Sequence, residues 1–408
     1  MPFVDELKFK ASYGENGNDG IGSYLFTKYY SISNSNDKVS LTPASLGNKN
    51  ITWEKNGKFN VGVDFSVLNH RIWGSVEYYN NMTKDMLSWV SLPPSYGWSG
   101  YYDNVGNMKN DGVEVDIHAD AIRTKDFTWN VYANLTTNRN KITKLSDSRK
   151  KQWQDGIGLG YSSGSFFYQE GHSRFTYYTR QYAGVDEYGQ STWWKNIYEK
   201  NAQGKDVYYD NNGNVVSDTY LGTKHRNVVG KERTTTYSDA DYYLCGDVLP
   251  DVYGGFGTSL SWKGIDFSVD FQYQLGGQVY DGTYAGLMSA NAGGAIHVDM
   301  LNAWSKDNQG SNIPRWQYGD DYMSAGSDRF LTSASYLSLA NITIGYTLPQ
   351  QWLKAIHLQS VRVYGVADNI WTWSKRQGLD PRQSITGSSS NAFYRPIRTI
   401  SGGITVTF

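Results

Sequence analysis

The fold class is decided by the stretch Lys58-Phe59-Asn60-Val61-Gly62-Val63-Asp64-Phe65-Ser66-Val67, in which every second residue is apolar. A period of two is typical of a β-strand with one apolar face, whereas a helix needs apolar residues three and four positions apart. A short polar turn at 69–71 follows, and the alternation resumes at Ile72, Gly74 and Val76. The two stretches together predict a β-hairpin.

The same alternation recurs along the chain and predicts ten strands in all. The apolar positions of the other eight strands fall within residues 7–13, 113–121, 127–135, 256–262, 267–273, 337–344, 361–365 and 400–408. Such a series of strands without helical periodicity predicts an all-β protein built from antiparallel hairpins.

The connections between these strands alternate in length. Tight turns are expected near residues 69, 124, 264 and 355. Long polar stretches cover 15–51, 88–110, 146–250, 276–334 and 374–396. Short turns at one end and long loops at the other are typical of a transmembrane β-barrel of the outer membrane, with the long loops outside the cell. Loops this long would be out of place in a compact domain.

The two faces of the predicted strands support this interpretation. One face is too polar for the core of a β-sandwich but suits a water-filled lumen, as shown by Asp64, Glu77, Glu114, Asp116, Asp270 and Gln272. Aromatic residues lie near both ends of the strands, where we expect them to form girdles at the two membrane interfaces: Trp129, Trp262 and Phe267 beside turns, and Tyr78, Tyr273 and Trp371 toward long loops. The alternative is that aromatic residues are simply good strand formers.

Composition excludes several other classes of protein. The 408 residues include 38 Lys and Arg against 39 Asp and Glu, so the net charge of −1 gives no electrostatic argument for nucleic acid. The single cysteine excludes an intrachain disulfide framework. No apolar run reaches the ~18 residues of a transmembrane helix. The first five residues lack a basic region before an apolar core, so we expect no signal peptide.

No arrangement of residues indicates an enzyme, a metal site or a cofactor. The side chains of Asp320 and Asp321 would point apart on extended backbone. The stretch Asp210–Asn214 does not match the ligand spacing of a calcium loop and predicts an Asn-Gly turn instead. Cys245 has no neighbouring base and is expected to be an inert thiol.

One long connection contains the only candidate binding residues. Aromatic rings crowd its polar, glycine-rich sequence: Trp193, Trp194, Tyr198, Tyr208, Tyr209, Tyr242 and Tyr243. We predict that these residues contact a ligand or a partner protein. A ligand would be a sugar whose rings stack on the aromatic faces. The alternative to ligand contact is that the aromatic rings pack the loop onto itself or onto a partner's surface, and direct ligand contact is the less favoured interpretation.

The last residues carry a second signal. Ile404, Val406 and Phe408 alternate with threonines, and the chain ends on the aromatic residue. A terminal strand that ends in Phe resembles the signal read by the outer-membrane assembly machinery. It predicts interaction with that machinery and with outer-membrane lipid.

Several stretches resemble, in the same order, the C-terminal barrel of SusC/RagA-family TonB-dependent transporters of Bacteroidota. They are Tyr13-Gly14, Gly17-Asn18, Ile21-Gly22, Ile51-Thr52-Trp53-Glu54-Lys55, Asn60-Val61-Gly62-Val63-Asp64-Phe65, Asn104-Val105-Gly106-Asn107-Met108-Lys109-Asn110, Gly112-Val113-Glu114, Tyr253-Gly254-Gly255-Phe256, Asp368-Asn369, Gly378-Leu379-Asp380-Pro381 and Tyr394-Arg395-Pro396-Ile397-Arg398 through to Phe408. The resemblance covers essentially the whole chain.

This resemblance implies that residues 1–408 form the last ten strands of a barrel of 22 strands in the cell outer membrane. It implies energy-dependent import of glycans, or less often peptides, with a SusD-like surface lipoprotein over the extracellular loops. Family members carry a signal peptide, a sandwich domain, a TonB-contacting segment and a plug before this region. We expect none of these here, so contact with the TonB complex would require the missing plug region.

Two other interpretations stay open at this stage. The chain is a truncated fragment without transport activity, or it is a passive porin or an adhesin-like surface barrel. Both are compatible with the absence of a plug. Which substrate is carried is not encoded in any motif of the sequence.

Overall fold

The structure is a computed structural model that describes residues 3–35, 38–150, 152–290, 293–354, 357–384, 386–389 and 395–408. The turn predicted near 355 and the quoted Tyr394 lie outside the described residues.

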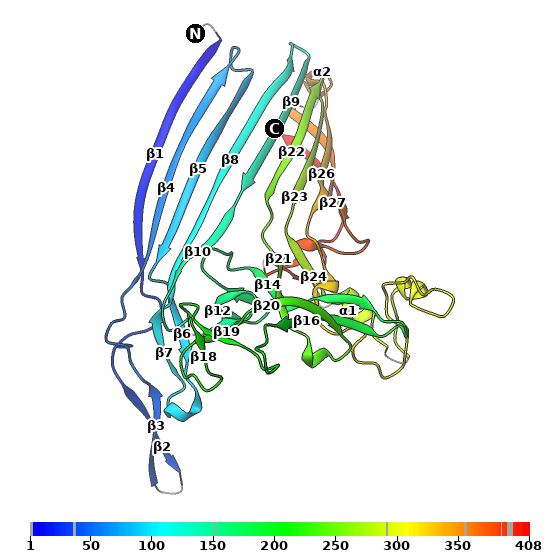
Figure 1. The fold of residues 1–408 in the computed structure, drawn as a ribbon. Helices are drawn as coiled ribbons and strands as arrows, with labels where there is room; N and C mark the ends of the chain where they lie inside the picture. Colours follow the sequence, from blue (N-terminus) through cyan, green and yellow to red (C-terminus); the bar gives the residue numbers. More distant parts are fainter. Residues whose placement is uncertain are drawn as a thin grey trace.

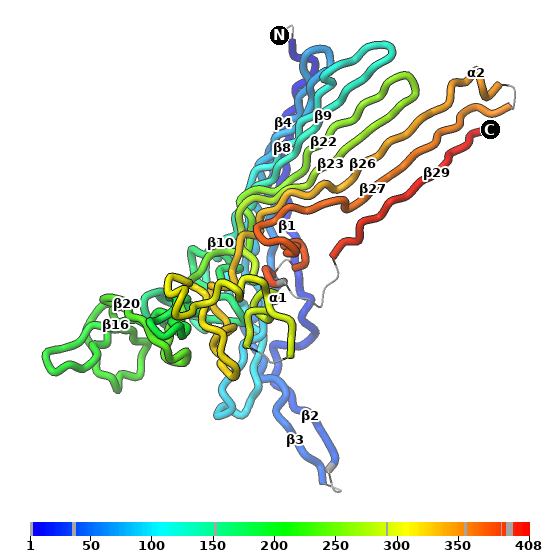
Figure 2. The backbone as a smooth tube through the Cα atoms, turned by 90° about the vertical axis from the view of Figure 1, so that its right-hand side faces the viewer, coloured from blue at the N-terminus to red at the C-terminus, as the bar shows by residue number. Residues whose placement is uncertain are grey.

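A single large antiparallel sheet, which we call the wall, dominates the structure (Figure 1). Its strands follow one another in the order β1 (Val4–Asn18), β4 (Glu54–Val67), β5 (Ile72–Lys84), β8 (Gly106–Arg123), β9 (Phe127–Thr137), β22 (Val252–Trp262), β23 (Ile265–Leu275), β26 (Tyr336–Thr347), β27 (Ser360–Ser374) and β29 (Thr399–Thr407). An eleventh strand, β10 (Arg139–Leu145), also pairs with β8. Figure 2 shows the wall as a curved sheet with β29 at one edge.

Tight turns join the hairpins at one end of the wall. Between β22 and β23, Trp262 lies opposite Ile265, so only Lys263 and Gly264 form the turn. Both have positive φ, 46° and 89°. Two consecutive residues of this kind make the turn whose twist matches a β-hairpin, and glycine adopts it without steric cost. The turns predicted near 69, 124 and 264 are therefore present.

The register places side chains of one kind in continuous rows across the wall. One row is apolar or aromatic apart from one glycine and contains Phe9, Val63, Val76, Val115, Leu135, Gly254, Tyr273, Leu337 and Trp373. The neighbouring row on the opposite face contains Lys8, Asp64, Ser75, Asp116, Asn134, Gly255, Gln272, Ser338 and Thr372. Because successive residues of a strand point to opposite faces, the wall has one apolar and one polar face.

The apolar face of the wall is uncovered. Phe9 is 75% exposed, Ile344 57% and Ile404 67%. A contiguous apolar surface of this extent marks contact with a membrane or another protein. On the polar face, side chains bond one another, as where Lys10 Nζ lies 2.6 Å from Asp64 Oδ1 and the Tyr132 hydroxyl donates to Asp270 at 2.7 Å. This two-faced sheet confirms the predicted fold class, while its place in a barrel of 22 strands stays a prediction.

The long connections gather at the other end of the wall and fold into small sheets of their own (Figures 1 and 2). The strands are β2 (Tyr29–Ser35) with β3 (Lys38–Ser45); β6 (Leu87–Ser91) with β7 (Gly100–Asn104); β11 (Gln152–Gln154), β12 (Gly158–Ser163), β13 (Phe166–Tyr168), β14 (Thr176–Arg180) and β21 (Tyr242–Asp247); β15 (Tyr182–Val185), β16 (Ser191–Tyr198) and β20 (Val228–Thr234); β17 (Tyr208–Asp210), β18 (Val215–Val216) and β19 (Lys224–Arg226); and β24 (Gln278–Asp281), β25 (Leu331–Ser333) and β28 (Ser388–Ser389).

Helices are few and short. Among the described residues, the α-helices are α1 (Gly282–Leu287) and α2 (Gln350–Leu353), and the 3₁₀ turns are η1 (Pro94–Tyr96), η2 (Tyr237–Asp239), η3 (Val298–Asn302), η4 (Asp328–Phe330) and η6 (Pro381–Gln383). Within the described part of the chain, none is long and apolar enough to cross a membrane.

The buried core lies among the long connections rather than in the wall. Its largest cluster contains Tyr284, Ala285, Met288, Ala290, Met300, Met323 and Phe330. Met288 is fully buried and Phe330 is 1% exposed. The stretches predicted as long polar loops therefore include segments that fold around apolar cores.

Candidate functional site

The described residues within 146–250 and 276–335, which we call the loop assembly, contain all seven candidate aromatic residues. They lie at the end of the wall opposite the tight turns (Figure 1). In the barrel predicted from the sequence, this end is where a substrate or a partner would arrive.

Trp193 lies in the interior of the loop assembly and is 1% exposed. Its ring meets Tyr237 and Tyr322 edge-on, at centroid distances of 5.0 and 5.9 Å. Tyr322 comes from the second long connection, so this cluster joins the two segments of the assembly. The indole Nε1 is buried with no hydrogen-bond acceptor among the described residues. Trp193 is thus placed as a core residue.

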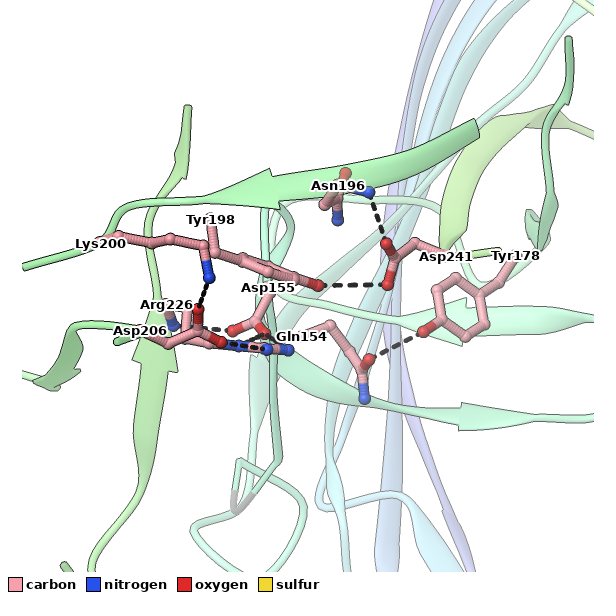
Figure 3. Close-up of polar contacts among 9 residues, drawn as sticks. All are labelled: Gln154, Asp155, Tyr178, Asn196, Tyr198, Lys200, Asp206, Arg226 and Asp241. Atoms are coloured by element: carbon pink, nitrogen blue, oxygen red, sulfur yellow. Dashed lines mark hydrogen bonds and ion pairs between the residues drawn. The ribbon is translucent and has the colours of Figure 1, made fainter. Parts of the chain in front are cut away.

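Arg226 is the centre of a polar network that ties three segments together (Figure 3). Its guanidinium donates from Nε to Asp155 Oδ2 at 2.9 Å and from Nη1 to Asp206 Oδ2 at 3.1 Å. The same group lies 3.6 Å from the centre of the Tyr198 ring. Lys200 Nζ donates to Asp206 at 3.0 Å, and this bond, with Arg226, holds the pKa of Asp206 below its usual range. The Arg226 guanidinium is planar, so it can donate to two carboxylates and stack on an aromatic ring at the same time, which a lysine ammonium group cannot do.

A second part of the network surrounds Asp241 (Figure 3). Its carboxylate accepts the backbone N–H of Asn196 at 2.6 Å and the Tyr198 hydroxyl at 3.2 Å. The Tyr178 hydroxyl donates to Gln154 Oε1 at 2.8 Å. Burial raises the pKa of both Tyr198 and Tyr178 to about 12, so both phenols stay protonated and donate near neutral pH.

The remaining candidate rings are engaged within the assembly in the same way. Cations lie over four of them: Arg233 over Trp194, Lys224 over Tyr208, Arg180 over Tyr242 and Lys231 over Tyr243, at 5.7, 5.0, 4.5 and 3.8 Å. The hydroxyl of Tyr209 donates to Glu199 at 2.9 Å, and that of Tyr243 donates to Asn196 at 2.7 Å. Cation–π contacts of this kind each contribute about 0.5–1 kcal/mol at exposed sites.

The structure therefore gives all seven predicted residues contacts inside the loop assembly. Contact with a ligand or a partner stays a prediction. Tyr242 is 39% exposed, whereas the other six candidates are buried or half-buried. Sequence reasoning missed Arg226, Asp155 and Asp206, which organise the assembly. They are up to 71 residues apart and follow no spacing rule that would have indicated their contact.

The side chains considered for chemistry are placed in ordinary structural surroundings. Burial raises the pKa of the Cys245 thiol to about 12, so the nucleophilic thiolate is scarce near neutral pH. Asp210 accepts the backbone N–H groups of Asn212 and Asn214, at 2.8 and 2.9 Å, in a turn. In the portion of the chain that the structure describes, no three His, Cys, Asp or Glu residues are grouped to hold a metal ion.

The proposed assembly signal lies at the edge strand of the wall. Ile404 and Val406 of β29 are opposite Val363 and Val361 on the apolar face. Phe408 follows the last strand and is 84% exposed. The arrangement keeps these apolar side chains available on the outside of the wall, and their reading by the assembly machinery stays a prediction.

Comparison with known proteins gives a consistent result. No model of a protein family matches the chain. The TonB-dependent receptor P3 of Formosa agariphila is 27% identical over 99% of this chain and 40% of the relative. The TonB-dependent receptor SusC of Bacteroides thetaiotaomicron is 27% identical over 98% of this chain and 37% of the relative. The chain thus spans about 40% of the length of the curated relatives it matches.

Solved structures agree with these relatives. A structure of the RagAB peptide transporter matches the whole chain with a TM-score of 0.73 and 27% identity, and the match covers 41% of that protein's chain. The RagAB peptide importer in the closed-closed state gives a TM-score of 0.76 and 28% identity, again over 41% of that chain. Sequence and fold therefore both confirm the resemblance predicted from the strand and loop motifs.

Proposed function

Because this chain is an outer-membrane β-barrel segment homologous to the C-terminal part of SusC- and RagA-type TonB-dependent receptors, we propose that it forms part of a nutrient importer. Residues 1–408 would act as one barrel region, with the apolar rows of the wall against lipid and the polar rows around a water-filled passage. The chain would not catalyse a reaction. Breakdown of the substrate would fall to other proteins.

The observation that carries this proposal is the register of the wall. Nine strands in succession keep apolar residues on one face and polar residues on the other, as the pairs Val63–Val76 and Asp64–Ser75 illustrate. A transmembrane barrel needs this arrangement because lipid and water lie on opposite sides of a single layer. A sandwich would need its apolar face covered by a second sheet.

The loop assembly would face the outside of the cell and meet a SusD-like surface lipoprotein. It has a packed core and a dense internal network, so it presents a defined surface rather than a mobile one. The imported molecules would be oligosaccharides or peptides. The RagAB peptide transporter is one of the solved structures that resemble this chain, and the aromatic content suits either class.

Uptake by the source organism tests the proposal. A strain that lacks the gene for this protein and a strain that lacks TonB are compared with the parent on defined pools of oligosaccharides and of peptides. We expect both strains to lose uptake of the same compounds, because import through such a receptor depends on TonB. Restoring the gene on a plasmid is the matched control.

Uptake that needs the gene but continues without TonB would overturn the importer proposal in favour of a passive porin. Normal uptake of all compounds without the gene would favour an inactive fragment. Recovery of the lipoprotein with the purified receptor is measured separately, since its loss would contradict the partner alone.

A further inference from the structure

A cavity of about 560 Å³ lies where the wall meets the loop assembly. Its lining comes from β6, from the first residues of β8, from β10, and from the segment that includes β12 and β13. Figure 1 shows β6, β10 and β12 at the loop end of the wall. The volume is within the range of small-ligand sites.

Arg149 is one of the residues that line this cavity. Nη2 donates to the carbonyl oxygen of Trp89 at 2.7 Å, and the group lies 4.5 Å from the centre of the Tyr161 ring. Its Nε is buried and has no acceptor within the described ranges. A buried cationic donor without an acceptor is costly, and a ligand with an acceptor group would satisfy it.

Arg174 adds a second positive charge to the same cavity. Arg174 and Tyr161 line the same cavity as Arg149. Burial raises the pKa of the Tyr161 phenol, and the positive charges of Arg149 and Arg174 both oppose that rise. Neither guanidinium has a carboxylate within 4.0 Å in the described portion of the chain, in contrast to Arg226 with Asp155 and Asp206.

The one acidic residue of the lining is already engaged. Glu54 accepts from the side-chain amides of Asn18 and Asn56 through Oε1, at 3.5 and 3.3 Å. It accepts the backbone N–H of Leu87 through Oε2 at 3.3 Å. The cavity therefore has a positive charge excess that its own carboxylate does not pair.

Flat rings and hydroxyl groups complete the lining. Tyr161 and Tyr168 stack in parallel with centroids 4.7 Å apart, and Trp89 lies on the same cavity. Ser162 and Ser163 provide hydroxyls beside them. Rings of this kind hold the body of a ligand, and a planar guanidinium matches a carboxylate with two hydrogen bonds.

We propose that this cavity binds a carboxylate group on the imported molecule, with Arg149 and Arg174 as its ligands and the Tyr161–Tyr168 pair against the attached ring or chain. The inference rests on the proposed import function and narrows its substrates to acidic ones. The carboxylate belongs to an acidic sugar or to an acidic amino acid of a peptide. The chemistry of recognition is the same in both cases.

Equilibrium binding to the purified full-length receptor in detergent tests this assignment. Calorimetric titrations use two matched pairs of probes: digalacturonic acid with neutral galactobiose, and amidated acetyl-Glu-Ala with amidated acetyl-Gln-Ala. We expect one acidic probe to bind and its neutral counterpart to bind about tenfold more weakly or not at all. The acidic probe that binds identifies the source of the carboxylate.

Variants locate the binding site. Arg174→Gln is the main variant, because the Arg174 guanidinium makes no hydrogen bond or ion pair with the described residues and lies only over the Phe175 ring, at 5.7 Å. Arg149→Gln is the second variant. Each should weaken the acidic probe about tenfold. Arg233→Gln is the matched control, an exposed arginine that lies over Trp194 away from the cavity, and it should leave affinity unchanged.

Three results would overturn the proposal: no binding of either acidic probe, equal binding of acidic and neutral probes, or full affinity in the Arg174→Gln variant. Binding does not require TonB. If uptake does not need TonB but the acidic probe still binds more tightly than its neutral counterpart, only the importer proposal is contradicted. If uptake needs TonB but the acidic and neutral probes bind equally, only the cavity assignment is contradicted.

Discussion

The wall and the loop assembly place their apolar residues in opposite ways. In the wall, Ile344 and Ile404 are more than half exposed, whereas in the loop assembly Phe167, Met288 and Phe330 are at most 1% exposed. The assembly folds as water-soluble domains do, around packed interiors. The wall is a single layer whose apolar face has no cover among the described residues, as expected of an outer-membrane β-barrel whose outer face meets lipid. One chain thus contains segments suited to two different solvents.

The largest expected effect concerns the core of the loop assembly. Trp193→Ala should destabilise it by about 3–5 kcal/mol, because a buried tryptophan is replaced by a cavity. Limited proteolysis should cut residues 176–247 faster in the variant than in the unchanged protein. The wall should stay folded in detergent at low temperature, as it does without the substitution. Trp194→Ala, at a half-buried position, is the control with a smaller effect.

The same experiment separates packing from partner contact. If Trp193→Ala leaves proteolysis unchanged but abolishes co-purification of the proposed surface lipoprotein, the ring contacts a partner and the core assignment is wrong.

The next effect tests the face of the wall. Val76 is 42% exposed, so its replacement by Arg removes little packing. It should nevertheless cost about 2–4 kcal/mol if the position lies near the bilayer midplane. The adjacent Ser75→Arg is the matched control, since residue 75 lies opposite Asp64 and Asp116 on the polar face. Unfolding of the receptor in lipid vesicles by urea measures both. Equal stability of the two variants would contradict a lipid-facing surface.

A smaller effect is expected in the Arg226 network. Arg226→Lys keeps the charge but loses the fork that reaches Asp155 and Asp206, so we expect a local loss of about 1–3 kcal/mol. Hydrogen exchange should accelerate in residues 152–158 and 206–210. Arg233→Lys is the control, and no difference between the two variants would show that the network is not stabilising.

The smallest effect is a pH dependence. The bond from Lys200, followed by that from Arg226, lowers the pKa of Asp206 in the folded state. The resulting stabilisation is present above the ordinary carboxyl value of 3.8 and is lost as pH falls through the lower folded value. The change should stay below about 1 kcal/mol because the pair is near the surface. Asp206→Asn should abolish this pH dependence of stability, measured by hydrogen exchange below pH 4. The same pH dependence of hydrogen exchange in the variant would contradict the stabilising role of Asp206.

The comparison also explains which parts of the structure could be predicted from the sequence. The strands of the wall were predictable because lipid and water impose a period of two, as in Phe59 to Val67. In β16 three consecutive residues, Ser191, Thr192 and Trp193, are all buried, so no period of two appears. The Arg226–Asp155 contact joins residues 71 positions apart, and such pairing depends on the tertiary fold. The candidate rings were located in one assembly, but their internal contacts were not predictable.

The central claim is that one face of the wall meets lipid and the other meets water. The most direct test is to measure how accessible spin labels along β4 are to reagents dissolved in the membrane and in water. The single native cysteine, Cys245, is replaced by alanine, and single cysteines at Asn60, Val61, Val63, Asp64 and Phe65 carry a spin label in lipid vesicles. We predict that labels at 61, 63 and 65 are relaxed mainly by membrane-dissolved oxygen, and those at 60 and 64 mainly by a water-soluble nickel complex. An accessibility profile without this period of two, or with the two faces reversed, would contradict the account.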